Sequence, residues 1–258
     1  MIVKAKKHLG QHFLHDENIA QKIVASLDGT HYPNVLEVGP GTGVLTKYLL
    51  DRSVTLSLAE IDEESIAYLK ETYPPITEET FVGDFLRLDI EGNFDSEVGV
   101  IGNFPYNISS QILFKIIDNY RKIPEMVGMF QKEVAERTAA KPRQKSYGIL
   151  SVLVQAYYDV EYLFTVNENV FTPPPKVKSG VIKLTRNPKE ALTGIEDLFK
   201  KIVKAGFNQR RKKLSNALKI MRIPQSMASH PFLDCRAEEL NVEDFIQFSI
   251  EWRNSCEG

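Results

Sequence analysis

The sequence contains little cysteine and no long apolar run. Its two cysteines, Cys235 and Cys256, are not spaced as a metal-binding pair. In a reducing compartment they need not form a disulfide, so no role is expected of either. No apolar run approaches the ~18 residues that indicate a membrane-spanning helix. The basic segment at residues 1–7 continues into polar residues and histidines, whereas a secretory signal continues into an apolar stretch. These absences predict a cytoplasmic protein with no membrane anchor.

A large excess of charge is also missing, because the formal net charge is only −2. The charges are nevertheless unevenly distributed. Residues 200–222 carry nine Lys or Arg and no Asp or Glu, while acidic residues gather at 62–79 and 234–244. Such a basic run is either a solvated helix face or a surface for phosphates. The aromatic and amide side chains of Phe207–Gln209, beside Arg210, favour the phosphate-binding interpretation.

No internal repeat is present, and the only low-complexity stretch is Pro173–Pro175. Across residues 16–185, short apolar runs alternate with amphipathic helical segments. This alternation predicts an α/β fold with a mostly parallel sheet that is covered on both faces. The strands are expected at 35–38, at 54–59, up to 81–82, at 98–101, at 149–158 and at 180–185.

Helices are expected between these strands. Asp16 and Asp62 are placed to cap two of them, and another covers residues 107–120. After residue 186 the pattern becomes helical, with one helix near Val242–Trp252. The sequence therefore predicts two domains. Residues 1–186 form an α/β domain, and residues 187–258 form a small all-α domain.

Glycines gather in the segment 37–43, Glu-Val-Gly-Pro-Gly-Thr-Gly, between a predicted strand and a predicted helix. In this position a Gly-rich turn lets a nucleotide-like ligand approach the backbone closely. A dinucleotide-binding turn needs Gly or Ala at the place of Val44, so that interpretation fails. The spacing is similar to the turn of methyltransferases that bind S-adenosylmethionine, with Gly39 and Gly41 facing the cofactor. A chance Gly-rich turn is the alternative.

Two acidic residues follow the next strands. Glu60 ends the second strand, ~20 residues beyond the first glycine, where an acidic side chain accepts hydrogen bonds from ribose hydroxyls. The alternative is that Glu60 only places a negative charge near the N-terminus of the helix that starts at Asp62. Asp84 ends the third strand and could accept a hydrogen bond from the adenine amino group of the cofactor, although Gly83-Asp84 is also an ordinary turn. Ligands bind at this carboxyl edge in open α/β sheets.

The stretch Asn103-Phe104-Pro105-Tyr106 follows the fourth strand. An exocyclic adenine amine is a poor nucleophile, because its lone pair is delocalised into the ring. Two hydrogen-bond acceptors on its N–H groups would turn that lone pair toward an incoming methyl group. The side-chain oxygen of Asn103 and the carbonyl of Phe104 could be these acceptors, with Tyr106 stacked on the base. A turn after a buried strand is the alternative.

Together with these motifs, further segments resemble the ribosomal RNA adenine dimethyltransferase family, the kasugamycin-sensitivity enzymes of bacteria and their relatives. The segments that carry the resemblance are Gly10–Asp16, Phe171–Ser179, Phe207–Lys212 and the helical C-terminal part. The resemblance covers nearly the whole chain. It implies a Rossmann-like, class I methyltransferase fold that binds S-adenosylmethionine, followed by a small helical RNA-binding domain.

The resemblance implies a role for each matched residue. Gln11, His12 and Leu14 belong to a segment that folds over the cofactor, and Phe171 stacks on the target base opposite Tyr106. The alternatives for Phe171 are a core aromatic beside the proline-rich stretch and part of a proline-rich ligand for a partner domain. His12 stands where the family usually has Asn, so its contact could come from the backbone. Phe104 stands where Leu is usual, which leaves the backbone carbonyl in place. The residues expected to bind the cofactor are Gln11, His12, Leu14, Gly39, Gly41, Glu60, Asp84 and Asn103. Those expected to act in catalysis are Asn103, Phe104, Tyr106 and Phe171. Those expected to bind RNA phosphates are Lys204, Arg210, Arg211, Lys212 and Lys213.

The resemblance also implies the reaction, which is the dimethylation of N6 in two adjacent adenosines near the 3′ end of small-subunit ribosomal RNA, in an immature subunit. Three alternatives stay open. One is a resistance methyltransferase acting on large-subunit ribosomal RNA, another is a ribosome-assembly or transcription factor with little catalysis, and the third is a DNA adenine methyltransferase, which more often carries Asp-Pro-Pro-Tyr. His8, His12 and His15 fall at helical spacing, but no carboxylate or Cys completes a metal site. We expect no metal and a monomer.

Overall fold

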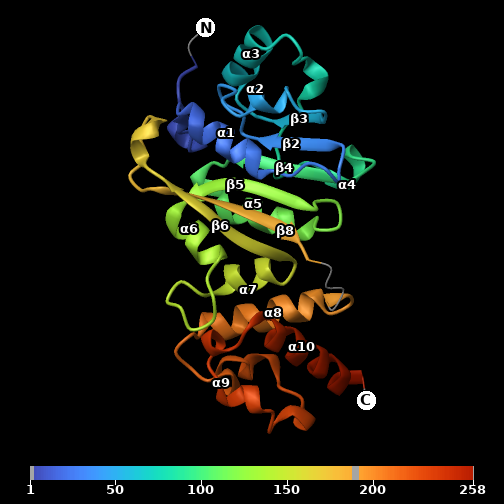
Figure 1. Ribbon diagram of the computed structural model, residues 1–258. Coiled ribbons are helices and arrows are strands. Elements are labelled where there is room, and N and C mark those ends of the chain that lie inside the picture. Colours follow the sequence, from blue (N-terminus) through green and yellow to red (C-terminus); the bar gives the residue numbers. More distant parts are fainter. Residues whose placement is uncertain (1–2, 188–191, 258) are drawn as a thin grey trace. The chain divides into compact units, whose positions relative to one another are not determined.

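The computed structural model describes residues 3–187 and 192–257 (Figure 1). The chain forms two compact units. The first consists of Met1–Glu136 and Asp159–Arg186, and the second of Arg137–Tyr158 and Asn187–Gly258. The sequence places a single division after residue 186. In the structure the second unit also includes residues 137–158, which the sequence assigns to the first domain.

A six-stranded sheet forms the centre of the first unit, in the order β3-β2-β4-β5-β8-β6 (Figure 1). Its strands are β2 (Asn34–Val38), β3 (Thr55–Ala59), β4 (Val98–Asn103), β5 (Glu125–Gln131), β6 (Tyr158–Val166) and β8 (Ser179–Arg186). β2 is parallel to β3 and β4, and β4 is parallel to β5, whereas β8 is antiparallel to β5. The predicted α/β fold is confirmed, with its parallel strands adjacent to one another.

Some of the strand predictions are wrong. Residues 149–155 form helix α7 (Ile149–Gln155), because a continuous apolar run does not distinguish a buried strand from a buried helix. The N–H of Gly148 donates to Ser151 Oγ at 3.0 Å, which starts this helix. The strand expected to end at 81–82 is reduced to one bridge between Phe81 and Leu58. Strand β5 has no counterpart among the predicted strands.

Helices of the first unit begin where the sequence places capping residues. The carboxylate of Asp16 accepts a hydrogen bond from Ile19 N at 3.0 Å, and that of Asp62 accepts one from Glu64 N at 3.2 Å. The helices before residue 139 are α1 (Glu17–Ser26), α2 (Thr46–Leu49), α3 (Glu63–Thr72), α4 (Ile90–Asn93), α5 (Ser109–Asp118) and α6 (Lys132–Thr138). Apolar side chains of α1 and of the segment around α2 pack with those of β2, β4, β5 and β8 in one core.

A small two-stranded sheet joins segments that are far apart in the sequence. β1 (Phe13–Leu14) is antiparallel to β7 (Phe171–Thr172), so Leu14 lies opposite Phe171. Both of these side chains are buried in the core that contains α1. A 3-10 helix, Lys7–Leu9, precedes β1. The pairing therefore anchors the N-terminal segment on the first unit.

The second unit is helical in the part that the structure describes. Its larger helices are α7, α8 (Glu196–Asn208), α9 (Leu214–Ala217) and α10 (Val242–Glu257), with short 3-10 helices between them. Phe199, Leu214, Phe245 and Phe248 are fully buried. The helical pattern predicted after residue 186 is confirmed, and α10 begins at Val242 as the sequence indicates.

Candidate active site

The strand ends and the N-terminal segment enclose a cavity of ≈ 240 Å³ in the first unit. Because β2, β3 and β4 are parallel neighbours, their carboxyl ends meet at one edge of the sheet. The predicted residues that line the cavity are Gln11, His12, Gly39, Gly41, Glu60, Asp84, Asn103, Phe104 and Tyr106. The fold thus brings together residues from separate segments of the chain around one space.

The glycine-rich turn follows β2 and leaves room for a ligand next to the backbone. Gly39 N donates to the carbonyl of Ala59 at 2.9 Å, which ties the turn to β3. Gly41 has φ +57°, and a Cβ at this position would lie 2.8 Å from Cε1 of Phe13. A side chain at residue 41 would therefore be strained and would fill the space between the turn and the N-terminal segment. The turn is suited to cradle a nucleoside-like ligand.

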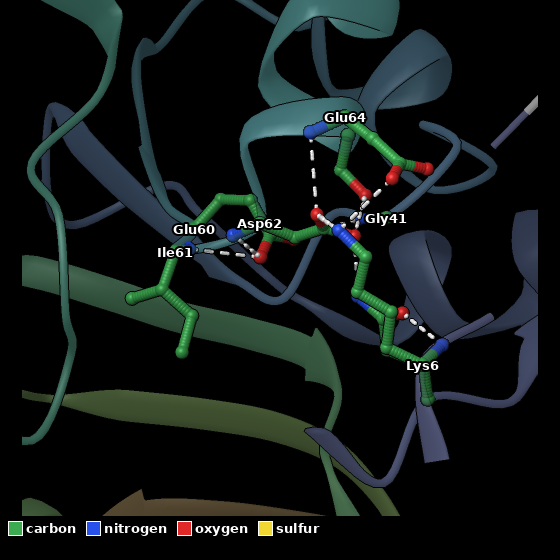
Figure 2. Close-up of polar contacts among 8 residues, drawn as sticks. Lys6, Gly41, Glu60, Ile61, Asp62 and Glu64 are labelled. Carbon is green, nitrogen blue, oxygen red and sulfur yellow. Dashed lines mark hydrogen bonds and ion pairs between the residues drawn. The ribbon is translucent and has the colours of Figure 1, made fainter. Parts of the chain in front are cut away.

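Glu60 follows β3, and backbone donors surround its carboxylate (Figure 2). Its Oε1 accepts from Ile61 N at 2.8 Å and from Asp62 N at 2.9 Å, and its Oε2 accepts from Gly41 N at 3.3 Å. Burial raises the pKa of this carboxyl, while the backbone N–H groups act in the opposite direction. A carboxylate has about four lone-pair positions, so Oε2 retains capacity to accept from a ribose hydroxyl.

A second carboxyl, Glu37, lies in β2 just before the glycine-rich turn and is only 1% exposed. Thr46 Oγ1 donates to its Oε2 at 2.7 Å. Burial raises the pKa of Glu37 to about 8, although the hydrogen bond from Thr46 lowers it. At pH 7 Glu37 is therefore mainly protonated, and it acts as a neutral hydrogen-bonding group beside the turn.

Asp84 follows the isolated bridge at Phe81 and lines the cavity. Its Oδ1 accepts from Leu86 N at 2.9 Å, and its Oδ2 lies 3.5 Å from Nε of Arg87. The side chain is 37% exposed, so its oxygens remain within reach of a ligand. Asp84 can therefore serve as an acceptor for an amino group, as the sequence predicts.

Asn103 ends β4, and one hydrogen bond orients its side chain. Its Nδ2 donates to the carbonyl of His12 at 2.8 Å, so its Oδ1 is directed elsewhere as an acceptor. Phe104 N donates to the carbonyl of Met129 at 3.1 Å, and the Phe104 ring packs on Phe130 with 4.8 Å between ring centroids. Because this ring is buried in the core, Phe104 lines the cavity through its backbone.

Tyr106 lies in a 3-10 turn after Pro105, and its hydroxyl is hydrogen-bonded to Oγ of Ser179. Burial raises the pKa of Tyr106, so the phenol is neutral at physiological pH. The ring of His12 stacks on that of Tyr106, with 5.3 Å between centroids and 28° between planes. His12 Nδ1 also lies 2.7 Å from the carbonyl O of Pro173. A histidine ring therefore covers one face of the tyrosine that the sequence assigns to base stacking.

A second cavity, of ≈ 690 Å³, has Gly10, Gln11, His12, Tyr106 and Asn107 in common with the first. The proline-rich loop, residues 173–177, forms another part of its wall. His12 and Tyr106 therefore lie at the junction of two cavities. This arrangement is suited to an enzyme that brings a flat base and a nucleoside cofactor to one point.

Two predicted site residues lie away from both cavities. Leu14 is 3% exposed and Phe171 is 2% exposed, and both belong to the hydrophobic core. The β1–β7 pairing buries them, because it places their side chains opposite each other on the core side. The structure thus differs from the expectation that Leu14 contacts the cofactor and that Phe171 stacks on a base opposite Tyr106.

The basic residues predicted to bind RNA lie in the second unit. Lys204, Arg211 and Lys212 are exposed, as a phosphate-binding surface requires. Lys213 is also exposed but pairs with Asp234 at 2.8 Å.

Arg210 has a different position from its basic neighbours. Its Nε donates to Glu238, and its Nη1 and Nη2 donate to the carbonyls of Lys145 and Gln144 at 2.7 and 3.1 Å. The structure therefore uses Arg210 to hold the 144–145 loop inside the unit, a role that the sequence does not indicate.

Sequence reasoning also missed several residues that line the first cavity. Ile61 is 56% exposed although it is large and apolar, and it follows Glu60 directly. Leu86 and Asn107 line the same cavity. An apolar side chain immediately after the acidic strand end was the available signal for Ile61, since it could cover the face of an adenine ring.

The fold is that of a Rossmann-like, class I S-adenosylmethionine-dependent methyltransferase, and the first cavity lies at the carboxyl edge of its parallel strands. A family model described as "Ribosomal RNA adenine dimethylase" matches residues 2–252. The chain belongs to this family, and the resemblance found in the sequence is confirmed.

Relatives of high identity support this assignment. The ribosomal RNA small subunit methyltransferase A of Cytophaga hutchinsonii is 56% identical over 250 residues, which cover 96% of each chain. The protein of the same name from Flavobacterium johnsoniae is 54% identical over 245 residues, 95% of this chain and 94% of the relative.

Solved structures share the fold. A dimethyladenosine transferase from Plasmodium falciparum superimposes with a TM-score of 0.80 and 25% identity, over 95% of this chain and 98% of that one. The 23S rRNA methyltransferase ErmE has a TM-score of 0.65 and 23% identity, over 91% of this chain and 98% of that one, and so shares the architecture.

Two further findings concern residues 3–187 and 192–257. Among them, no helix combines the length and apolar character needed to cross a membrane. Nor do these residues contain a group of three or more His, Cys, Asp or Glu side chains that could hold a metal ion.

Proposed function

We propose that this chain transfers methyl groups from S-adenosylmethionine to N6 of two adjacent adenosines near the 3′ end of small-subunit ribosomal RNA, giving N6,N6-dimethyladenosine. Membership of the ribosomal RNA adenine dimethylase family supports the reaction. Relatives at 54% and 56% identity, both named for the small ribosomal subunit, support the choice of RNA. The proposed substrate is an immature subunit in the cytoplasm, where bacterial subunits assemble. We take the enzyme to act as a monomer, with both cavities lined by segments of one chain.

The walls of the first cavity suit S-adenosylmethionine. Glu60 Oε2 accepts from the ribose hydroxyls, Asp84 accepts from the adenine amino group, and Ile61 covers the adenine ring. Gly41 lines this cavity, and its φ of +57° lets the turn bend without strain so that its backbone can face the cofactor. When bound, the cofactor supplies an electrophilic methyl group on a positively charged sulfur.

Asn103 and Phe104 act on the target amine. Asn103 Oδ1 and the Phe104 carbonyl accept its two N–H groups, which localises the lone pair on nitrogen and directs it toward the methyl group. The hydrogen bond from Asn103 Nδ2 to the His12 carbonyl, at 2.8 Å, carries this proposal, because it determines which end of the amide is the free acceptor. Holding the two reactants in line supplies much of the acceleration. The amine releases its proton to solvent after transfer.

The target base reaches the site from the second cavity and stacks on Tyr106. Adenine inside a duplex cannot enter such a pocket, so the target lies in a single-stranded loop or is flipped out. Since His12 covers one face of Tyr106, the base either displaces the His12 ring or uses the opposite face. Phe171 is buried, so this stacking relies on Tyr106 alone. Lys204, Arg211 and Lys212 hold phosphates of the surrounding RNA.

The test is to incubate the protein with methyl-labelled S-adenosylmethionine and, separately, immature small subunits, naked small-subunit RNA and large-subunit RNA. Digestion to nucleosides then identifies the product and the position of the label. We expect N6,N6-dimethyladenosine at two adjacent positions of small-subunit RNA. Label confined to large-subunit RNA, or no label in any RNA, would reject the proposal.

A further inference from the structure

The N-terminal strap, defined as residues 6–12, spans the first cavity and is fastened on both sides of it. On one side it contacts the start of α3, two residues after Glu60 (Figure 2). On the other side it contacts the end of β4, at Asn103. Residues 8–12 of the strap line the cavity. The strap therefore connects the cofactor side of the site with the residue that orients the amine.

Asp62 makes the contact on the α3 side. Lys6 Nζ donates to Asp62 Oδ1, and Gln11 Nε2 donates to Asp62 Oδ2 at 3.1 Å. Lys6 Nζ also lies 3.3 Å from Glu64 Oε1 (Figure 2). The Asp62 side chain is fully buried, whereas that of Lys6 is 29% exposed. A charge-assisted hydrogen bond to a buried carboxylate is among the stronger polar contacts in proteins.

The strap is closed on itself by Gln11. While its Nε2 donates to Asp62, its Oε1 accepts from Lys6 N at 2.8 Å. Lys6 and Gln11, near the two ends of the strap, therefore both donate to the Asp62 carboxylate. At Gly10, with φ +67°, a Cβ would lie 2.6 Å from Oδ1 of Asn107, so the strap also lies tightly against the segment after β4.

On the β4 side, the strap contacts Asn103, the residue that we propose orients the target amine. The residue next to Gln11 is His12, and its carbonyl accepts the hydrogen bond from Asn103 Nδ2 at 2.8 Å. If the strap moves away, the Asn103 amide loses the only partner that the structure gives its nitrogen, and Oδ1 is no longer held as the acceptor for the adenine N–H. The contact between Asp62 and the strap therefore affects the orientation of the Asn103 amide, and through it methyl transfer, as well as cofactor binding.

We propose that Lys6 and Asp62 are positioning residues for methyl transfer, which act through the strap to hold the Asn103 amide in its reactive orientation. The inference rests on the proposed function for the role of Asn103. Lys6 is the better residue to change, because Asp62 also caps α3 and its loss would disturb that helix. Lys6→Met removes the ammonium and keeps most of the aliphatic stem. Lys6→Arg restores a donor.

Lys70→Met is the matched control. Lys70 lies on α3 and pairs with Glu78 at 2.5 Å, so this variant also removes one Lys–carboxylate pair from the same helix, away from the strap. Single-turnover methylation of small subunits at saturating S-adenosylmethionine gives the rate, and calorimetry gives the cofactor affinity. Amide hydrogen exchange of residues 6–12 in the cofactor-free protein reports the strap without any activity.

We expect Lys6→Met to lower the saturated rate about tenfold and to speed exchange in the strap about tenfold. Its melting temperature should fall further than that of Lys70→Met, because the Asp62 side chain is fully buried and loses a charged partner, whereas the Glu78 side chain is 78% exposed. Lys6→Arg should recover most of the rate. In an Asn103→Ala background, Lys6→Met should have little further effect on the rate, because both changes act on one group. A raised cofactor Kd with an unchanged saturated rate would overturn the inference, as would additive effects of Lys6→Met and Asn103→Ala.

The same experiment separates this inference from the proposed function. Wild-type protein that methylates no small-subunit RNA counts against the proposed function. Exchange of residues 6–12 that is equal in Lys6→Met and Lys70→Met counts against the Lys6–Asp62 contact as the fastening of the strap, whatever the substrate.

Discussion

Replacement of Glu37 by Gln should make the protein more stable at alkaline pH. Glu37 is 1% exposed, and its pKa lies at about 8 because burial disfavours its charged form. In the unfolded chain its pKa is close to the ordinary value of 4.5. Above pH 4.5 the unfolded state therefore releases this proton while the folded state keeps it, so folding stability falls as pH rises until the folded carboxyl also ionises near pH 8.

The size of the effect follows from the difference between the two pKa values of Glu37, 4.5 in the unfolded chain and about 8 in the folded protein. At about 1.4 kcal/mol per pH unit, the loss of unfolding free energy from this one carboxyl is about 5 kcal/mol in full and about 4 kcal/mol between pH 5 and pH 9. Gln has nearly the same shape, carries no charge at any pH, and its Oε1 can accept the hydrogen bond that Thr46 Oγ1 donates at 2.7 Å. The unfolding free energy of Glu37→Gln minus that of wild type should therefore increase as pH rises.

Urea unfolding of both proteins at intervals from pH 5 to pH 9 measures this difference. Glu97→Gln is the control, since it removes a partly exposed carboxylate that pairs with Arg186 at 2.6 Å, and its profile should run nearly parallel to wild type. Thr46→Val should extend the fall in stability to higher pH and make it larger, because the hydrogen bond from Thr46 lowers the pKa of Glu37 in the folded protein while the pKa in the unfolded chain is unchanged. A Glu37→Gln profile that parallels wild type to within about 1 kcal/mol would refute a protonated, buried Glu37.

Four further predictions concern the cavity and the basic residues of the second unit. Asn103→Ala should keep cofactor affinity within a few-fold by calorimetry yet lower the single-turnover rate at least about 100-fold, as loss of a catalytic hydrogen-bond acceptor does, and near-normal turnover would exclude its role. Glu60→Gln should weaken cofactor binding at least about tenfold, because its amide N–H groups would face backbone donors. Wild-type affinity should rise with pH through the Glu60 pKa, since burial raises that pKa and the ionised form is the better acceptor, and a pH-independent Kd would contradict this. Changing Arg211 and Lys212 together to Ala should reduce the slope of log Kd for RNA against log salt by about 1.4, and an unchanged slope would remove them from the interface.

The sequence by itself determined the features that depend on local chemistry. Asp16 and Asp62 cap helices because a short acidic side chain reaches the N–H groups of the next turn, which needs no distant partner. The glycine-rich turn and the Asn103–Tyr106 stretch were visible for the same reason, since backbone freedom at Gly41 and the restricted φ at Pro105 are properties of single residues. Order along the chain also placed Glu60 and Asn103 at one edge, because parallel strands end on the same side of a sheet.

Only the tertiary structure decided what depends on distant segments. Ile149–Gln155 has the composition of a strand or of a buried helix, and it forms helix α7, which packs against α8 much later in the chain. Phe171 is aromatic and next to a proline-rich loop, but pairing of β7 with β1 turned it into the core.

The same is true of the contacts that hold the site together. Lys6 and Asp62 are 56 residues apart, and His12 and Asn103 are 91 apart. No pattern in the sequence links such residues, because their interaction exists only after strand pairing has set the two segments side by side. The sequence therefore revealed the residue types and their local chemistry, whereas the tertiary fold determined the orientation of the Asn103 amide.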